Sequence, residues 1–167
     1  MRSALGARSR SAPVGPGNVD RLRVGVISDV HSNLPALSAV LESIEAAAPE
    51  EIWCLGDVVG YGAQPDECTA LIQERCAVSL NGNHDLAETG TIDAATFSET
   101  ARTAVNWTRE HASPETLEYL TGFAPEGERE GLGLFHASPR DPIWEYVLSI
   151  DKAEAGLDAQ QQRISLV

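Results

Sequence analysis

Side chains that can bind a metal ion or transfer a proton follow four separate apolar segments of this sequence. They are carboxylates, imidazoles and one amide, a mixture that suits Mn²⁺, Fe or Zn²⁺ better than Ca²⁺. In chain order they are Asp29, His31, Asp57, Asn83, His84, Asp85 and His136. A fold that gathers them at one place could hold divalent cations and supply a general acid beside them.

The apolar segments that precede these residues are predicted to be β-strands with helices between them. The expected strands are 23–29, 51–55, 77–80 and 131–137, and a further strand begins at 164–167. The expected helices are one capped by Asn33, one at 65–75, two within 93–121 and one at 154–163. This order is typical of βαβ units around a largely parallel sheet, which is an α/β fold. Ligands bind at the carboxyl ends of such strands, so we expect the polar side chains to meet at one rim.

Each of these residues also has an ordinary structural interpretation. Asp57 could end a strand in a turn, and Asn81-Gly82 is a sequence typical of a hairpin turn, which would make Asn83 a turn residue. An Asp-x-His motif after a strand is weak by itself, and His136 could be a hydrogen-bonded core histidine. These interpretations are independent of one another, and the hypothesis of a metal site fails only if all of them are correct. We therefore favour a metal site at the rim.

Composition limits the partners of the chain. At 167 residues, of which 43% are hydrophobic, it is long enough for one domain with a buried core. The formal net charge is −13, and because residues 1–23 hold five arginines and one aspartate, the remainder carries −17. Such a surface repels duplex nucleic acid and favours a small-molecule substrate. No apolar run approaches the roughly 20 residues that cross a bilayer, so no membrane partner is expected.

Cysteine usage and the N-terminal segment give two further expectations. Cys54, Cys68 and Cys76 show no CxxC spacing, which favours a reduced, cytoplasmic protein. Cys54 lies in an apolar run and is expected in the core. Residues 1–20 are rich in Ser, Pro, Gly and Arg and are predicted to form a disordered basic leader. The folded domain is predicted to cover residues 21–167.

Four sequence blocks resemble, in order, the signature blocks of calcineurin-like metallophosphoesterases, in particular a small bacterial branch of phosphodiesterases. They are S-D-V-H-S-N (28–33), G-D-V-V-G-Y-G (56–62), G-N-H-D (82–85) and F-H-A-S-P (135–139). Ala137 stands where that branch usually has glycine. The fifth block of the family, Gly-His-x-His, should follow a strand like the one at 164–167. The resemblance therefore implies a domain that is incomplete at its C-terminus, nearly inactive and weak in metal binding.

The resemblance implies a dinuclear metal site. Asp29 and His31 would bind one cation, Asn83 and His136 the other, and Asp57 would bridge both. Mn²⁺ is the expected metal, with Fe, Zn²⁺ and Ni²⁺ as alternatives. Such a pair can generate a bridging hydroxide and clamp the phosphate oxygens during in-line attack.

The resemblance also implies how the reaction proceeds. His84 would protonate the leaving oxygen, and Asp85 would hold His84 in its productive orientation. The substrate would be a small nucleotide-like phosphoester, with a nuclease of related fold or a non-catalytic remnant as the alternatives. Arg140 could contact the substrate phosphate, although plain packing of Trp144 and Tyr146 nearby is an equal alternative.

Overall fold

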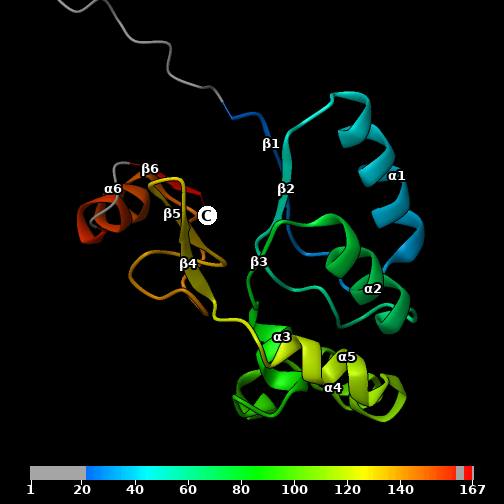
Figure 1. Ribbon diagram of the computed structural model, residues 1–167. Helices are drawn as coiled ribbons and strands as arrows, with labels where there is room; N and C mark the ends of the chain where they lie inside the picture. The colour runs from blue at the N-terminus through cyan, green and yellow to red at the C-terminus, as the bar shows by residue number, and fades with distance from the viewer. Residues whose placement is uncertain (1–21, 161–163, 167) are drawn as a thin grey trace, which may run out of the picture.

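The computed structural model describes residues 22–160 and 164–166, so the expected leader at 1–20 and residues 161–163 lie outside the described part. Figure 1 shows two sheets side by side, with helices packed against the outer face of one of them. The first sheet consists of three parallel strands in the order β1 (Val24–Ile27), β2 (Glu51–Cys54) and β3 (Val78–Ser79). The α/β class predicted from the sequence is confirmed.

The second sheet was not expected as a separate unit. It contains β4 (Glu126–Arg129), β5 (Leu132–Phe135) and β6 (Ile164–Leu166), with β4 antiparallel and β6 parallel to β5. The turn between β4 and β5 uses Glu130 at φ 53° and Gly131 at φ 74°, as a two-residue hairpin requires. The strand β4 was not predicted because its residues, EGER, are polar and mostly exposed.

The helices follow the predicted order, with differences at their ends. They are α1 (Leu34–Ala46), α2 (Pro65–Arg75), α4 (Glu99–His111), α5 (Pro114–Leu120) and α6 (Ile150–Ala159), plus a short 3₁₀ turn at Ala94–Thr96. Asn33 caps α1 as expected, because its Oδ1 accepts from the Ala36 N–H at 3.2 Å. The helix α6 begins four residues earlier than predicted because Ser149 caps it. No helix in the described residues is both long and apolar enough to cross a bilayer.

The segment N-G-N-H-D forms a helix and not a turn. The short helix α3 covers Asn83–Glu88, and the Asp85 side chain accepts from the Gly82 N–H at 2.9 Å. Asn81 is held elsewhere, because its side-chain amide donates to the carbonyls of Leu120 and Phe123 at 2.7 and 3.0 Å. The alternative of an Asn81-Gly82 hairpin is therefore wrong.

Two buried clusters fix the sheets. One packs α1 and α2 onto the first sheet and contains Cys54, as predicted. The other joins the two sheets through Trp53, Leu55, Leu80 and Leu134. Full burial of each large side chain contributes roughly 1.5–3 kcal/mol. This second cluster seats the end of β5 against the ends of β2 and β3.

Candidate metal centre

All five predicted metal ligands line one cavity of about 620 Å³, together with His84. Three strands of the first sheet deliver four of them: Asp29 and His31 follow β1, Asp57 follows β2, and Asn83 follows β3 at the start of α3. The fifth, His136, follows β5 and therefore comes from the second sheet. One sheet was predicted to supply all the residues of the rim, whereas in the structure the second sheet packs against the first and supplies His136.

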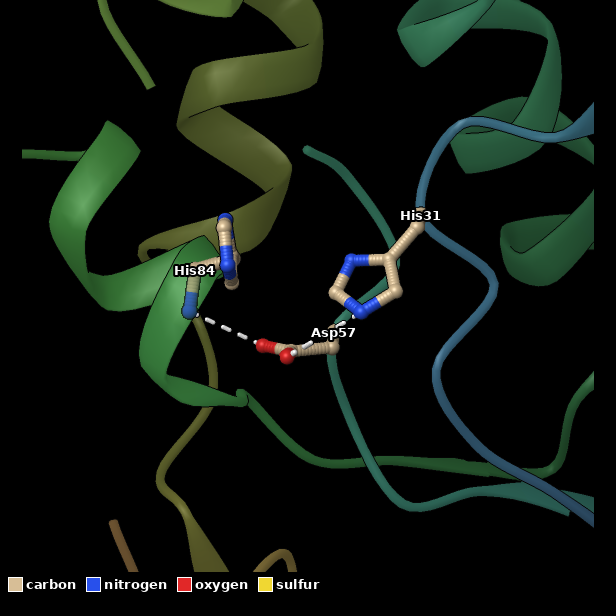
Figure 2. A group of neighbouring side chains, drawn as sticks. All are labelled: His31, Asp57 and His84. Atoms are coloured by element: carbon tan, nitrogen blue, oxygen red, sulfur yellow. Dashed lines mark hydrogen bonds and ion pairs between the residues drawn. The ribbon is translucent and has the colours of Figure 1, made fainter. Parts of the chain in front are cut away.

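Asp57 lies at the centre of this group and is only 3% exposed. Its Oδ2 is 3.6 Å from the Nε2 of His31 and 3.7 Å from the Nε2 of His136. Its Oδ1 accepts the backbone N–H of His84 at 2.9 Å, as Figure 2 shows. One oxygen is therefore fixed by the protein, while the other lies between two imidazoles.

Each imidazole has a second oxygen ligand next to it. Asp29 Oδ1 is 3.8 Å from His31 Nε2, and Asn83 Oδ1 is 3.3 Å from His136 Nε2. The site thus consists of two donor groups, each with an imidazole nitrogen and a side-chain oxygen of its own, and both share Asp57. The arrangement thus offers two sets of donor atoms around one carboxylate.

The two imidazoles are held in the tautomer that binds metals. His31 Nδ1 lies 3.2 Å from the Val59 carbonyl oxygen, and His136 Nδ1 lies 2.9 Å from that of Leu55. A carbonyl only accepts hydrogen bonds, so Nδ1 carries the proton in each neutral ring. The lone pair of each ring is then on Nε2, which faces Asp57.

The loops that carry the site are held in unusual backbone conformations. Seven non-glycine residues of the described chain have positive φ, and five of them lie in the loops after β1 and β2: Asp29, His31, Ser32, Asp57 and Tyr61. Such conformations cost free energy and cluster at functional sites. Backbone hydrogen bonds connect the two loops, including His31 N–H to the Asp57 carbonyl at 2.9 Å.

Asp85 holds one of these loops and does not hold the His84 ring. It is fully buried, and its oxygens accept the N–H groups of Val58, Val59 and Gly82 at 3.2, 3.0 and 2.9 Å. These three bonds clamp the loop after Asp57 to the start of α3. The predicted role of Asp85 in orienting His84 is therefore wrong in this structure.

The buried negative charge of the site favours the binding of cations. Burial raises the pKa of Asp57 well above its usual range, and the charges of Asp85 and Asp29 raise it further. A buried carboxylate beside two other acids is unfavourable without positive charge. The donor set is therefore the kind that divalent ions fit, with imidazole and oxygen ligands at one place.

His84 is placed differently from the other two histidines. It is 3% exposed and its ring lies 5.0 Å from that of His31 and 4.5 Å from that of Tyr61. Burial lowers its pKa to about 4, with His31 and His136 adding to the effect. One atom each from His31, Asp57 and His84 lies within 4.8 Å of the others, so this trio could itself hold an ion. His84 Nδ1 has no carbonyl partner, however, which distinguishes it from the two histidines with fixed tautomers.

Comparison with known proteins assigns the family. The model of the calcineurin-like phosphoesterase family matches residues 22–148, which include all seven residues predicted for the site. The chain belongs to this family. Its membership confirms the resemblance of the four sequence blocks and agrees with a metal-dependent site at the rim.

Individual relatives are similar over much of the chain. MJ0912, an uncharacterised protein of Methanocaldococcus jannaschii, is 40% identical over 129 residues, which are 74% of this chain and 53% of that protein. A metallophosphoesterase structure from Sphaerobacter thermophilus gives a TM-score of 0.74 at 37% identity, covering 87% of this chain and 59% of its own. PH1004 from Pyrococcus horikoshii OT3 gives 0.70 at 22% identity over 81% and 64%, which supports the fold alone. The chain therefore spans 53% to 64% of these relatives.

Part of the lining of the cavity is apolar. Ile143, Val147 and Leu148 line it together with the aromatic rings of Phe97, Trp144 and Tyr146. The rings of Phe97 and Trp144 are in edge contact, 5.2 Å apart. Trp144 and Tyr146 thus line the cavity and keep 38% and 67% of their surface exposed. Arg140 does not line the cavity and instead faces Glu145, at 3.6 Å.

Sequence analysis missed one buried acid behind the site. Glu88 is 2% exposed at the end of α3, one turn after His84. Burial raises its pKa to about 9, and the Asp85 charge contributes, while the Thr108 hydroxyl opposes the shift. The sequence L-A-E-T-G offered no apolar pattern that would place this glutamate inside the protein.

Glu88 should make the metal-free protein less stable as the pH rises. The unfolded chain loses this proton near the usual glutamate pKa, whereas the folded chain keeps it to about pH 9. Between pH 6.5 and 8 the folded state therefore binds more protons, and unfolding should become easier by up to about 1.4 kcal/mol per pH unit. The melting temperature should fall by roughly 4–8 °C over this range. Scanning calorimetry in EDTA should show a clearly shallower fall in Glu88→Gln, and identical slopes would contradict the burial of this acid.

Proposed function

We propose that this chain hydrolyses small organic phosphoesters with two divalent cations that share Asp57. The near inactivity that the family resemblance implied is set aside in this proposal, because described residues form both donor groups. The observation that carries the proposal is the place of Asp57 Oδ2, 3.6 and 3.7 Å from two imidazole nitrogens whose residues follow strands of different sheets. Asp29 with His31 would hold one cation, and Asn83 with His136 the other. The carboxylate and imidazole set favours Mn²⁺, with Fe, Zn²⁺ and Ni²⁺ as alternatives.

The residues of the chain provide orientation and proton transfer. Bound cations would supply an activated water as nucleophile and neutralise the charge of the phosphate. Asp57 stays in place because the His84 N–H fixes its Oδ1, and the loop that carries it is clamped by Asp85. His84 would give a proton to the departing oxygen, a role supported by its place in the cavity lining and by its not being needed to complete either donor group.

The lining of the cavity, which is polar at the candidate ligands and apolar at residues such as Trp144, favours a particular kind of substrate. A phosphate at the polar wall would place its organic group against Trp144 and Tyr146, whose exposed faces can stack on a planar ring. A volume of about 620 Å³ suits a molecule the size of a nucleotide. The acidic surface of the chain argues against duplex nucleic acid as the substrate. Three free cysteines are consistent with a cytoplasmic location, which we propose on that ground.

The proposal is tested by metal-dependent turnover. Mn²⁺ should raise hydrolysis of bis(p-nitrophenyl) phosphate by the protein at least about 100-fold over the same sample in EDTA, because the cations supply both the nucleophile and charge neutralisation. A nucleoside phosphodiester should be cleaved as well, and single-stranded DNA much more slowly. Preferential cleavage of DNA would favour the nuclease alternative. No turnover with Mn²⁺, Fe²⁺, Zn²⁺ or Ni²⁺ would contradict the proposal.

A further inference from the structure

Behind the metal centre lies a group of buried polar side chains without hydrogen-bond partners. In the described part of the chain, His84 Nδ1, both carboxyl oxygens of Glu88 and the Thr108 hydroxyl are enclosed and make no hydrogen bond of normal geometry. The Thr108 hydroxyl is nevertheless near enough to the Glu88 carboxyl to oppose the rise of its pKa. All three side chains are at most 3% exposed. His84 and Glu88 come from α3, and Thr108 comes from α4, which packs against it.

Gly60 shows how close the first two groups are. A Cβ at this glycine would lie 2.7 Å from His84 Nδ1 and 3.3 Å from Glu88 Oε1. The two atoms are therefore at most 6.0 Å apart, and both lie next to Gly60. Any side chain at position 60 would clash with the His84 ring, and the φ of +101° also favours glycine there.

No hydrogen bond of the Glu88 carboxyl in the described residues offsets the free-energy cost of its burial. A buried carboxyl without a hydrogen bond costs about 1–3 kcal/mol or more. Asp85, three residues earlier, is fully buried too, but three backbone N–H groups satisfy it. The guanidinium of Arg109 is near, yet it donates to the backbone carbonyls of Ala87 and Glu88 and not to the carboxyl group. One oxygen of the carboxyl, Oε1, lies at most 6.0 Å from His84 Nδ1.

We propose that Glu88 is the positioning residue of His84, and that its carboxyl reaches Nδ1 through one water in the space beside Gly60. Such a water would have His84, Glu88 and Thr108 as polar partners, which is the number that buried waters usually have. The link would fix the ring so that Nε2 is the nitrogen presented to the cavity. The orientation of the ring follows from the buried group alone, whereas its effect on turnover rests on the proposed function.

Two substitutions separate positioning from a structural role. Glu88→Met keeps the size but removes the polar group, and Glu88→Gln keeps an acceptor oxygen. Because an unsatisfied buried acid is replaced by an apolar group, Glu88→Met should melt at the same temperature as the wild type or higher. Its kcat on a nucleoside phosphodiester should fall about 10-fold with KM nearly unchanged, as for other groups that orient a catalytic side chain. Glu88→Gln should recover most of this loss. The exposed Glu110→Gln on α4 is the matched control.

The ring itself can be observed without turnover. The chain has only four histidines, so ¹⁵N-histidine spectra can be assigned by single substitutions. The His84 ring signals should shift in Glu88→Met, shift less in Glu88→Gln and stay unchanged in Glu110→Gln. Unchanged His84 signals in Glu88→Met would overturn the inference. If Glu88→Met does not fold, the same criterion applies to Glu88→Gln. A shifted ring with an unchanged kcat would instead contradict the acid role of His84, and a wild type without turnover would contradict only the proposed function.

Discussion

Asp57→Asn is expected to reduce phosphoester hydrolysis at least about 100-fold and to weaken the binding of both cations together. The Oδ2 of Asp57 lies between the two donor groups, so a neutral amide there removes negative charge from both of them. A loss of about 3 kcal/mol or more in electrostatic stabilisation corresponds to this change in rate. Steady-state kinetics in saturating Mn²⁺ and calorimetric titration of Mn²⁺ would measure the two effects.

The matched control for this change is Asp158→Asn, the same substitution on the exposed surface of α6. It should leave both quantities unchanged. The amide can still accept the His84 N–H at the position of Oδ1, so the melting temperature of metal-free Asp57→Asn should not fall. Near-normal turnover, or the loss of only one of two binding events, would show that Asp57 does not serve both cations.

His84→Ala is expected to affect substrates according to their leaving groups. A nitrophenolate leaves without a proton, whereas an alkyl or nucleoside alcohol needs one from a general acid. The variant should therefore lose about 10²–10³-fold on a nucleoside ester and less than about 10-fold on a nitrophenyl ester. Its Mn²⁺ content should stay close to that of the wild type, because His84 lacks the carbonyl-fixed tautomer of His31 and His136.

The same variant tests the other role that the geometry allows. His31, Asp57 and His84 offer atoms within 4.8 Å of one another, so His84 could act as a ligand (Figure 2). In that case His84→Ala would lose metal and would lose the same factor on both esters. That pair of results would reassign His84 from proton transfer to metal binding.

The sequence was sufficient to predict which residues gather at the rim. Asp29, Asp57 and Asn83 each follow an apolar, β-branched segment, and parallel strands place their carboxyl ends at the same edge. The helix at 65–75 was predicted with its observed ends, because Pro65 marks its start. Local sequence patterns therefore predict an element correctly where the spacing of its apolar residues matches the positions that are buried.

The remaining features depend on contacts between distant segments. The second sheet is held to the first by side chains such as Trp53 and Leu134, and nothing local in the polar β4 sequence predicts it. The bonds of Asp85 go to backbone N–H groups at residues 58 and 59, which no side-chain motif specifies. Glu88 could not be placed inside the protein because its burial is created by the packing of α4 on α3. Sequence analysis therefore predicted which residues gather at the rim but not the groups that hold them in place.

The most direct test of two cations sharing Asp57 is the electron paramagnetic resonance spectrum of the Mn²⁺-loaded protein. Two Mn²⁺ ions joined by one carboxylate interact magnetically, so at two equivalents of Mn²⁺ the spectrum should be that of a coupled pair. In Asp57→Asn this coupled signal should disappear. A spectrum of isolated Mn²⁺ in the wild type at saturation, or binding of a single ion per chain, would contradict the shared site.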